Sequence, residues 1–153
     1  MINRRSLLLA MSPVLVLPAP GVPDFRGKTL DGTVFTKTSL KGRAVLIQFW
    51  ATWCGYCRRD QPAVEEVAER YRDKLVVLAV SVREERATVL SYLQRSPRKS
   101  RIVLTRDTNL VDVFEPRGFP YYALLDAAGR LAGEQPGAGG REGLRELLAR
   151  GGV

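Results

Sequence analysis

The sequence predicts an α/β domain in which a central mixed β-sheet is flanked by helices and preceded by a β-hairpin extension. Continuous apolar runs at residues 44–50 and 75–81 are typical of buried parallel strands, and a pattern of helical period follows each of them. Nearer the C-terminus, two short strand-like runs separated by Ala127-Ala128-Gly129 predict an antiparallel pair. Because both kinds of pairing are expected in one chain, the sheet should be mixed.

The first residues of the chain are typical of a secretory signal peptide. Arg4 and Arg5 precede an apolar stretch that ends near Leu17. As a helix, this stretch covers only roughly 18 Å, whereas a bilayer core is about 30 Å thick. We therefore expect residues 1–19 to direct export to a bacterial periplasm, by the Sec or the twin-arginine route, or else to remain as an uncleaved N-terminal anchor. Residues 20–153 are expected to form one domain.

The first half of this domain is expected to hold a hairpin, a central strand and a long helix. Asp31-Gly32 lies between apolar residues and predicts a hairpin over residues 30–35. The run at residues 44–50 is the expected central parallel strand. From Cys54 to about Asp73, apolar residues keep helical spacing, and Pro62 is expected to kink that helix.

The second half continues the alternation of strands and helices. The last helix follows a flexible glycine-rich connector, Gly137-Ala138-Gly139-Gly140. The expected elements are a strand at 75–81, a helix at 84–94, a strand at 101–105, a helical turn at 110–114, strands at 121–126 and 130–134, and a helix at 141–150.

The tetrad Cys54-Gly55-Tyr56-Cys57 contains the only two cysteines of the chain. It lies between the expected central strand and the expected long helix. In that position the first sulfur reaches a helix N-terminus, where unpaired N–H groups and the helix dipole stabilise a thiolate. The second sulfur, one turn along, can attack a mixed disulfide formed on the first. The pattern predicts a thiol–disulfide oxidoreductase.

A metal site and a purely structural disulfide are the other uses of two cysteines. A structural zinc site takes about four ligands, and the chain has no histidine to help complete one. A disulfide that closes so short a loop removes little entropy from the unfolded chain, so stability is a poor reason for it. We favour redox function over a structural disulfide, and expect no metal and no cofactor beyond the redox-active disulfide Cys54–Cys57.

The chain carries a formal net charge of +8, and much of the excess lies in residues 95–101. A nucleic-acid-binding domain would interleave basic with aromatic residues or contain a known module, and neither pattern occurs. We therefore expect no nucleic-acid partner. Residues 95–101 are expected to be a solvated connection between a helix and a strand, with attraction to an acidic partner or an anionic lipid surface as the alternative.

Three segments of the chain form a recognisable combination: Pro23-Asp24-Phe25, the run from Leu46 to Pro62 around the dithiol, and Gly118-Phe119-Pro120. Together they resemble the thioredoxin superfamily, and within it the exported TlpA-like and ResA-like branch that includes the cytochrome c maturation thioredoxins. The resemblance extends from about Pro23 to Arg150 and implies a thioredoxin-like fold.

The resemblance also implies roles for individual residues. Cys54 would be the attacking and more exposed thiol, and Cys57 the buried resolving thiol. Pro120 would be cis, with the backbone of Phe119 pairing with the bound substrate.

The surroundings of the dithiol carry further expectations. Trp53 would shield the site and offer an apolar contact surface, whereas Trp50 fits a core position better. Many relatives have a proline between the cysteines, where this chain has Gly55-Tyr56. Tyr56 keeps a backbone N–H near the sulfurs, which stabilises a thiolate and makes the disulfide easier to reduce. The same pair resembles that of bacterial disulfide isomerases, which points to a more oxidising couple.

The proton acceptor for the resolving thiol is also expected to differ from that of thioredoxin. Thioredoxin has a buried aspartate under the dithiol, and this chain has Gln48 there, which cannot take up a proton. Asp60 matches the acidic residue that ResA-like proteins place beside their site, and is the expected relay for the Cys57 proton. The alternative is that Asp60 is a solvated helix carboxylate paired with Arg58 or Arg59.

The resemblance and the expected export imply an enzyme that reduces disulfides in exported thiol proteins such as apocytochrome c. A membrane electron donor would recharge it, and we expect a monomer. A disulfide oxidase or isomerase of exported proteins uses the same atoms and is one alternative. A redox-inert module that binds substrate proteins is the other.

Overall fold

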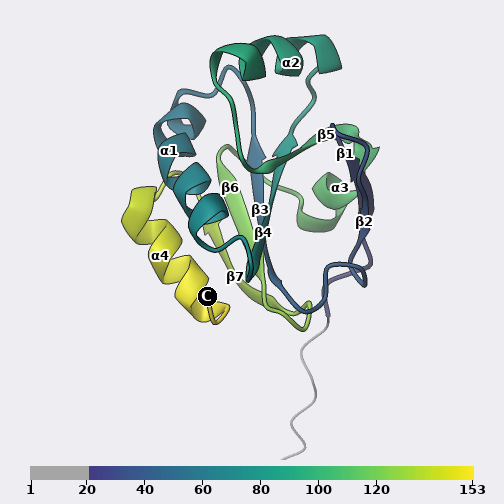
Figure 1. Ribbon diagram of the computed structural model, residues 1–153, viewed down its shortest axis with the longest axis vertical. Coiled ribbons are helices and arrows are strands. Elements are labelled where there is room, and N and C mark those ends of the chain that lie inside the picture. Colours follow the sequence, from purple (N-terminus) through teal and green to yellow (C-terminus); the bar gives the residue numbers. More distant parts are fainter. Residues whose placement is uncertain (1–20) are drawn as a thin grey trace, which may run out of the picture.

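The computed structural model describes residues 21–153, so the expected signal segment, residues 1–19, lies outside the described residues. One seven-stranded sheet lies between helices (Figure 1). The strands are β1 (Arg26–Thr29), β2 (Val34–Thr36), β3 (Ala44–Trp50), β4 (Leu75–Ser81), β5 (Arg101–Thr108), β6 (Tyr121–Leu125) and β7 (Leu131–Pro136). The helices are α1 (Gly55–Arg70), α2 (Arg86–Arg95), α3 (Leu110–Phe114) and α4 (Gly140–Arg150).

The sheet is mixed, as the sequence predicts, and its strand order is β2-β1-β5-β4-β3-β6-β7. β3 and β4 pair in parallel, as do β4 and β5, whereas β6 pairs antiparallel with β3 and β7 antiparallel with β6. Every residue of β3 and of β4 is buried. Both faces of these strands are therefore covered, which explains their continuous apolar runs.

Alternate residues of β3 build two apolar layers on opposite faces of the sheet. Ile47 packs in one cluster with Leu110 of α3. Its neighbour Leu46 packs in another cluster with Val64 of α1 and Leu144 of α4. α1 and α4 therefore cover the same face, where they lie side by side in Figure 1, and α3 covers the other.

The predicted N-terminal hairpin forms from β1 and β2 at one edge of the sheet, although β1 lies before the predicted bounds of 30–35 and β2 extends one residue past them. Gly27 pairs with Phe35, and the N–H of Thr29 donates to the carbonyl of Thr33 at 3.0 Å. The turn needs Gly32, whose φ of +89° lies in a region that side chains disfavour.

Other element bounds differ from the predicted ones by a few residues. α1 ends at Arg70 rather than near Asp73, and it continues as one helix through Pro62. β5 runs to Thr108 rather than Thr105 because Thr108 pairs with Gly27 of β1. The partners are far apart in sequence, so the local side-chain pattern gives no sign of this pairing. Between residues 21 and 153, no helix has the length and apolar character needed to cross a membrane.

Candidate active site

Cys54 follows β3 and forms the N-cap of α1. Its Sγ accepts a hydrogen bond from the backbone N–H of Cys57 at 3.1 Å, and the two residues are joined in a disulfide with a Cα–Cα distance of 5.2 Å. The predicted order of strand, dithiol and helix is therefore present. It places the sulfur of Cys54 where unpaired N–H groups and the helix dipole favour negative charge.

Both cysteines are enclosed in the disulfide-bonded state. The exposed fractions are 5% for Cys54 and 3% for Cys57, so the expected contrast between an exposed and a buried thiol is small. The two residues pack in an apolar cluster with Trp50 and Ala51, where Trp50 is fully buried as expected. A substrate that reaches Cys54 must therefore pass the side chains at the rim of this cluster.

That rim is apolar and exposed. Trp53 is 68% exposed and Tyr56 is 61% exposed, the latter with the guanidinium of Arg59 stacked over its ring at 5.0 Å. The rings of Trp53 and Phe119 meet in an edge-to-face arrangement with a centroid distance of 6.1 Å. This contact brings the loop that carries Phe119 and Pro120 beside the dithiol segment, and the peptide bond between these two residues is cis. Large exposed aromatic side chains next to a reactive group are typical of a protein-binding surface.

Asp60 is buried rather than solvated, with an exposed fraction of 1%. Its carboxylate accepts hydrogen bonds from the hydroxyl of Tyr122 at 2.8 Å and from the backbone N–H groups of Gly139 at 3.3 Å and Gly140 at 3.0 Å. The alternative of a surface carboxylate paired with Arg58 or Arg59 is therefore wrong. The helix turns the side chain of Asp60 inward, away from these two exposed arginines.

The basic segment 95–101 is also not wholly solvated. The side chain of Arg98 is 1% exposed and forms an ion pair with Glu65 at 2.7 Å. It donates to buried Gln48 at 2.7 Å and lies over the ring of Trp50 at 4.7 Å. Burial acts to raise the pKa of Glu65, but the charge and hydrogen bond of Arg98 hold it below its usual value. The expectation of a solvated connection is wrong at Arg98 because this one guanidinium has a carboxylate, an amide and an aromatic face to receive it.

The sequence analysis missed Glu84, which lies in the loop between β4 and α2. Its carboxylate accepts from the backbone N–H of Thr52 at 2.8 Å, from the Thr52 hydroxyl, and from the hydroxyl of Ser81 at 2.8 Å. Glu84 thus fixes the segment two residues before Cys54. No local pattern identifies its role, since the sequence predicts Glu84 only as the first residue of a helix at 84–94.

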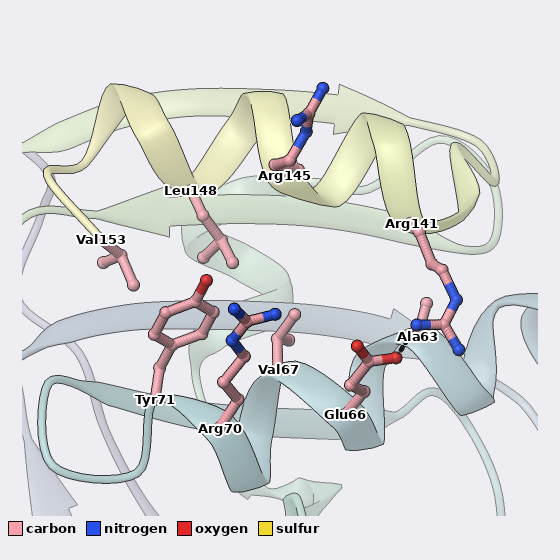
Figure 2. Close-up of a pocket in the computed structure, with 9 residues that line it drawn as sticks. All are labelled: Ala63, Glu66, Val67, Arg70, Tyr71, Arg141, Arg145, Leu148 and Val153. Atoms are coloured by element: carbon pink, nitrogen blue, oxygen red, sulfur yellow. Dashed lines mark hydrogen bonds and ion pairs between the residues drawn. The ribbon is translucent and has the colours of Figure 1, made fainter.

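A pocket of about 200 Å³ lies between α1 and α4, away from the dithiol (Figure 2). Ala63, Val67 and Leu148 form its apolar wall, and an ion pair between Arg141 and Glu66 crosses one end. None of the predicted site residues lines it. Within residues 21–153, no group of three or more His, Cys, Asp or Glu side chains could hold a metal ion.

Comparison with known proteins gives consistent matches. A family model described as Redoxin matches residues 19–148. The chain is 49% identical over 59 residues to the thioredoxin-like protein YneN of Bacillus subtilis, a match that spans 39% of this chain and 35% of that protein. It is 28% identical over 127 residues to the thiol-disulfide oxidoreductase ResA of Geobacillus thermodenitrificans, across 82% of this chain and 73% of that protein. A solved structure described as a putative thiol:disulfide interchange protein DsbE from Chlorobium tepidum matches with a TM-score of 0.75 and 24% identity, covering 85% of this chain and 94% of that chain. The last match confirms the predicted fold class.

Proposed function

We propose that this protein, which belongs to the Redoxin family and is a thioredoxin-like thiol–disulfide oxidoreductase, reduces disulfide bonds in exported proteins such as apocytochrome c. The observation that supports thiol–disulfide exchange most directly is the position of Cys54. Its sulfur sits at the N-terminus of α1 and accepts the Cys57 N–H at 3.1 Å. That environment favours the thiolate, which is the nucleophile that attacks a client disulfide, while the reduction potential decides the direction of electron flow.

The proposed reaction has two exchange steps. The Cys54 thiolate attacks one sulfur of the client disulfide, the client S–S bond breaks, and the other client sulfur leaves as a thiolate that takes up a proton. Cys57 then gives up its proton and attacks the sulfur of Cys54. The mixed disulfide breaks, the Cys54–Cys57 disulfide forms, and the second client thiol is released. Two electrons pass from the dithiol to the client.

Asp60 is the proposed acceptor of the Cys57 proton. It lies three residues after Cys57 on α1, which places both side chains on the same face of the helix. Gln48 occupies the buried strand position beneath, and an amide cannot take up the proton. Asp60 would return the proton to the departing client sulfur, so the step needs no other acid or base.

Trp53 and Phe119 form the proposed client surface. The client backbone would pair with the backbone of Phe119 before Pro120, while Trp53 contacts apolar side chains of the client. We further propose that residues 1–19 direct export and that a membrane electron donor reduces the Cys54–Cys57 disulfide after each turnover.

The reduction potential of residues 20–153 tests this proposal. Trp50 lies in the same apolar cluster as both cysteines, so we expect its fluorescence to report their redox state. The protein would be equilibrated in glutathione and dithiothreitol buffers, with a Cys54→Ser/Cys57→Ser variant as the control. A potential near or below roughly −270 mV supports a reductant. A value of roughly −120 to −180 mV would instead assign the protein to disulfide formation or isomerisation. The absence of a reversible couple would leave a redox-inert binding module.

A further inference from the structure

A continuous chain of side-chain hydrogen bonds runs through the protein from Asp60 to Glu65. The hydroxyl of Tyr122 donates to Asp60 at 2.8 Å, and Nε2 of Gln48 donates to that hydroxyl at 3.3 Å. Nη2 of Arg98 donates to Oε1 of Gln48 at 2.7 Å, and Nε of Arg98 donates to Glu65 at 2.7 Å. This chain of hydrogen bonds joins α1, β6, β3 and the connection between α2 and β5.

Water has little access to these groups. Asp60, Gln48 and Tyr122 are buried residues, and the side chain of Arg98 is buried as well. A buried donor or acceptor that loses its partner has no solvent to replace it. Each of these side chains therefore depends on the hydrogen-bond partner that it has in the fold. A change at one end of the series of hydrogen bonds alters the bonds along the whole series.

The chemistry of Arg98 fixes the direction of every bond in the chain. A guanidinium only donates, so Oε1 of Gln48 must accept and Nε2 must face Tyr122. Nε2 is itself only a donor, so the Tyr122 oxygen accepts from it and directs its single proton to Asp60. Burial and the Asp60 carboxylate raise the pKa of Tyr122, so the hydroxyl keeps that proton at ordinary pH.

We propose that Arg98, acting through Gln48 and Tyr122, is a positioning residue for the redox reaction that holds Asp60 as the acceptor of the Cys57 proton. This inference rests on the proposed function, in which Asp60 takes that proton. It also gives a role to the guanidinium of Arg98, which the sequence pattern places in a solvated connection.

The groups that face Asp60 support this role. Tyr122 reaches it from β6, and the N–H groups of Gly139 and Gly140 reach it from the start of α4. All three groups donate hydrogen bonds, so the carboxylate form of Asp60 can accept every one of them. A protonated Asp60 would carry its own O–H group, which would face one of these donors without an acceptor. Cys57, on the same face of α1, is then the group from which Asp60 can take a proton.

The test is the pH dependence of the step in which Cys57 resolves a mixed disulfide. The mixed disulfide between Cys54 and a chromogenic thiol would be formed by rapid mixing, and thiol release followed from about pH 4 to 9. Tyr122→Phe keeps the ring and removes one donor to the Asp60 carboxylate. We expect the acid limb of the profile to move to higher pH by about one unit, because a carboxylate that loses a donor is protonated more readily. Tyr92→Phe is the matched control, since its hydroxyl donates to Gln61 at 2.7 Å, outside the chain. Tyr92→Phe should leave the acid limb of the pH profile at the pH found for the unaltered protein.

A second variant tests the direction of the bonds. Gln48→Glu has the same shape and still accepts from Arg98, but its other oxygen cannot donate, so it would compete with Asp60 for the single proton of Tyr122. We expect the same upward shift of the acid limb. Gln61→Glu adds a carboxylate on α1 next to Asp60 in sequence, and the shift it produces should be smaller.

Two results would be decisive against the inference or its premise. If Tyr122→Phe and Gln48→Glu lowered the free energy of unfolding but kept the wild-type pH profile, the chain would be structural only and the inference would be overturned. If the unaltered protein showed no Cys54-dependent disulfide reduction at all, the proposed function would fail first. Should one variant not fold, the other still decides the point, because each breaks a different bond of the chain.

Discussion

Cys54 and Cys57 differ mainly in their position relative to the start of α1, and that difference supports the roles proposed for them. Cys54 is the N-cap residue with its sulfur at the helix end, while Cys57 lies one turn inside the helix. Replacing Cys57 with serine should therefore stop the reaction after the first exchange. We expect Cys57→Ser to accumulate a covalent complex with client protein, visible by non-reducing electrophoresis and mass spectrometry. Cys54→Ser is the control and should form none. Complexes formed equally by both variants would contradict the assigned roles.

Asp60 is the residue whose substitution separates proton transfer from nucleophilic attack. Asp60→Asn keeps the shape but removes the group that is proposed to take the Cys57 proton. We expect the resolution of the mixed disulfide to slow by on the order of 100-fold at pH 7, as is typical when a general base is lost. The alkylation of Cys54 by iodoacetamide should change much less. The exposed Asp73, just beyond α1, offers the control variant Asp73→Asn, and equal resolution rates in the two variants would remove Asp60 from the mechanism.

At the scale of elements, the ion pair between Arg98 and Glu65 ties the connection before β5 to the middle of α1. Glu65 also accepts from the hydroxyl of Ser100 at 2.8 Å, so the whole turn depends on it. Arg98→Met would leave a partly buried carboxylate without its cation, and we expect it to lower the free energy of unfolding by about 3–5 kcal/mol in urea titrations. Arg95→Met changes an exposed arginine of the same segment and should lie within about 0.5 kcal/mol of the unaltered protein. A similar small effect for Arg98→Met would mean that the pair contributes little.

The same pair predicts how stability changes with acidity. The folded protein holds the pKa of Glu65 below its usual value of 4.5, so its contribution is present above that pH and is lost as the pH falls below it. We expect the free energy of unfolding to fall more steeply on acidification in the unaltered protein than in Glu65→Gln. Glu69→Gln, at a more exposed position on the same helix, provides the comparison. Parallel curves for the unaltered protein and Glu65→Gln would contradict the assignment.

The elements and the dithiol were predictable because their signals are local. The apolar run of β3, the two cysteines and the helical spacing of α1 are contiguous in sequence, and the structure places them as expected. The buried polar chain has no such signal. Its hydrogen-bonded partners are far apart in the sequence. Arg98 and Gln48 are separated by 50 residues, Gln48 and Tyr122 by 74, and Tyr122 and Asp60 by 62. Arg98 stands among other basic residues after a proline, and only the fold determines which of these charges turns inward.

At the scale of the whole molecule, positive charge lies on both sides of Trp53, in the proposed client surface. One groove beside exposed Trp53 is lined by Arg58 and Arg95, and another by Arg83 and Arg117. Among the described residues, neither groove is lined by an Asp or Glu side chain. Within residues 21–153, none of these arginines forms an ion pair. Their charge is therefore available to a client.

This placement predicts a preference for clients with acidic residues beside the disulfide. Two disulfide peptides of equal length would be compared, one with glutamate and one with lysine flanking the cysteines. We expect the acidic peptide to be reduced roughly tenfold faster at low salt, since attraction of this kind raises association rates by that order or more. The advantage should shrink as salt screens exposed charges, largely disappearing near 1 M, where the screening length is about 3 Å.

Charge reversal locates the origin of this preference on the surface. Arg95→Glu/Arg117→Glu places one acid in each groove, and it should abolish or invert the preference between the two peptides. Arg72→Glu/Arg150→Glu lowers the net charge equally, but just beyond the C-terminal end of α1 and at that of α4, and it should keep most of the preference. The reaction of both variants with dithiothreitol, which is neutral and small, should stay unchanged, because it needs the dithiol and not the grooves. If the two double variants lost the preference to the same extent, net charge alone would steer the client, and the grooves would have no part in its selection.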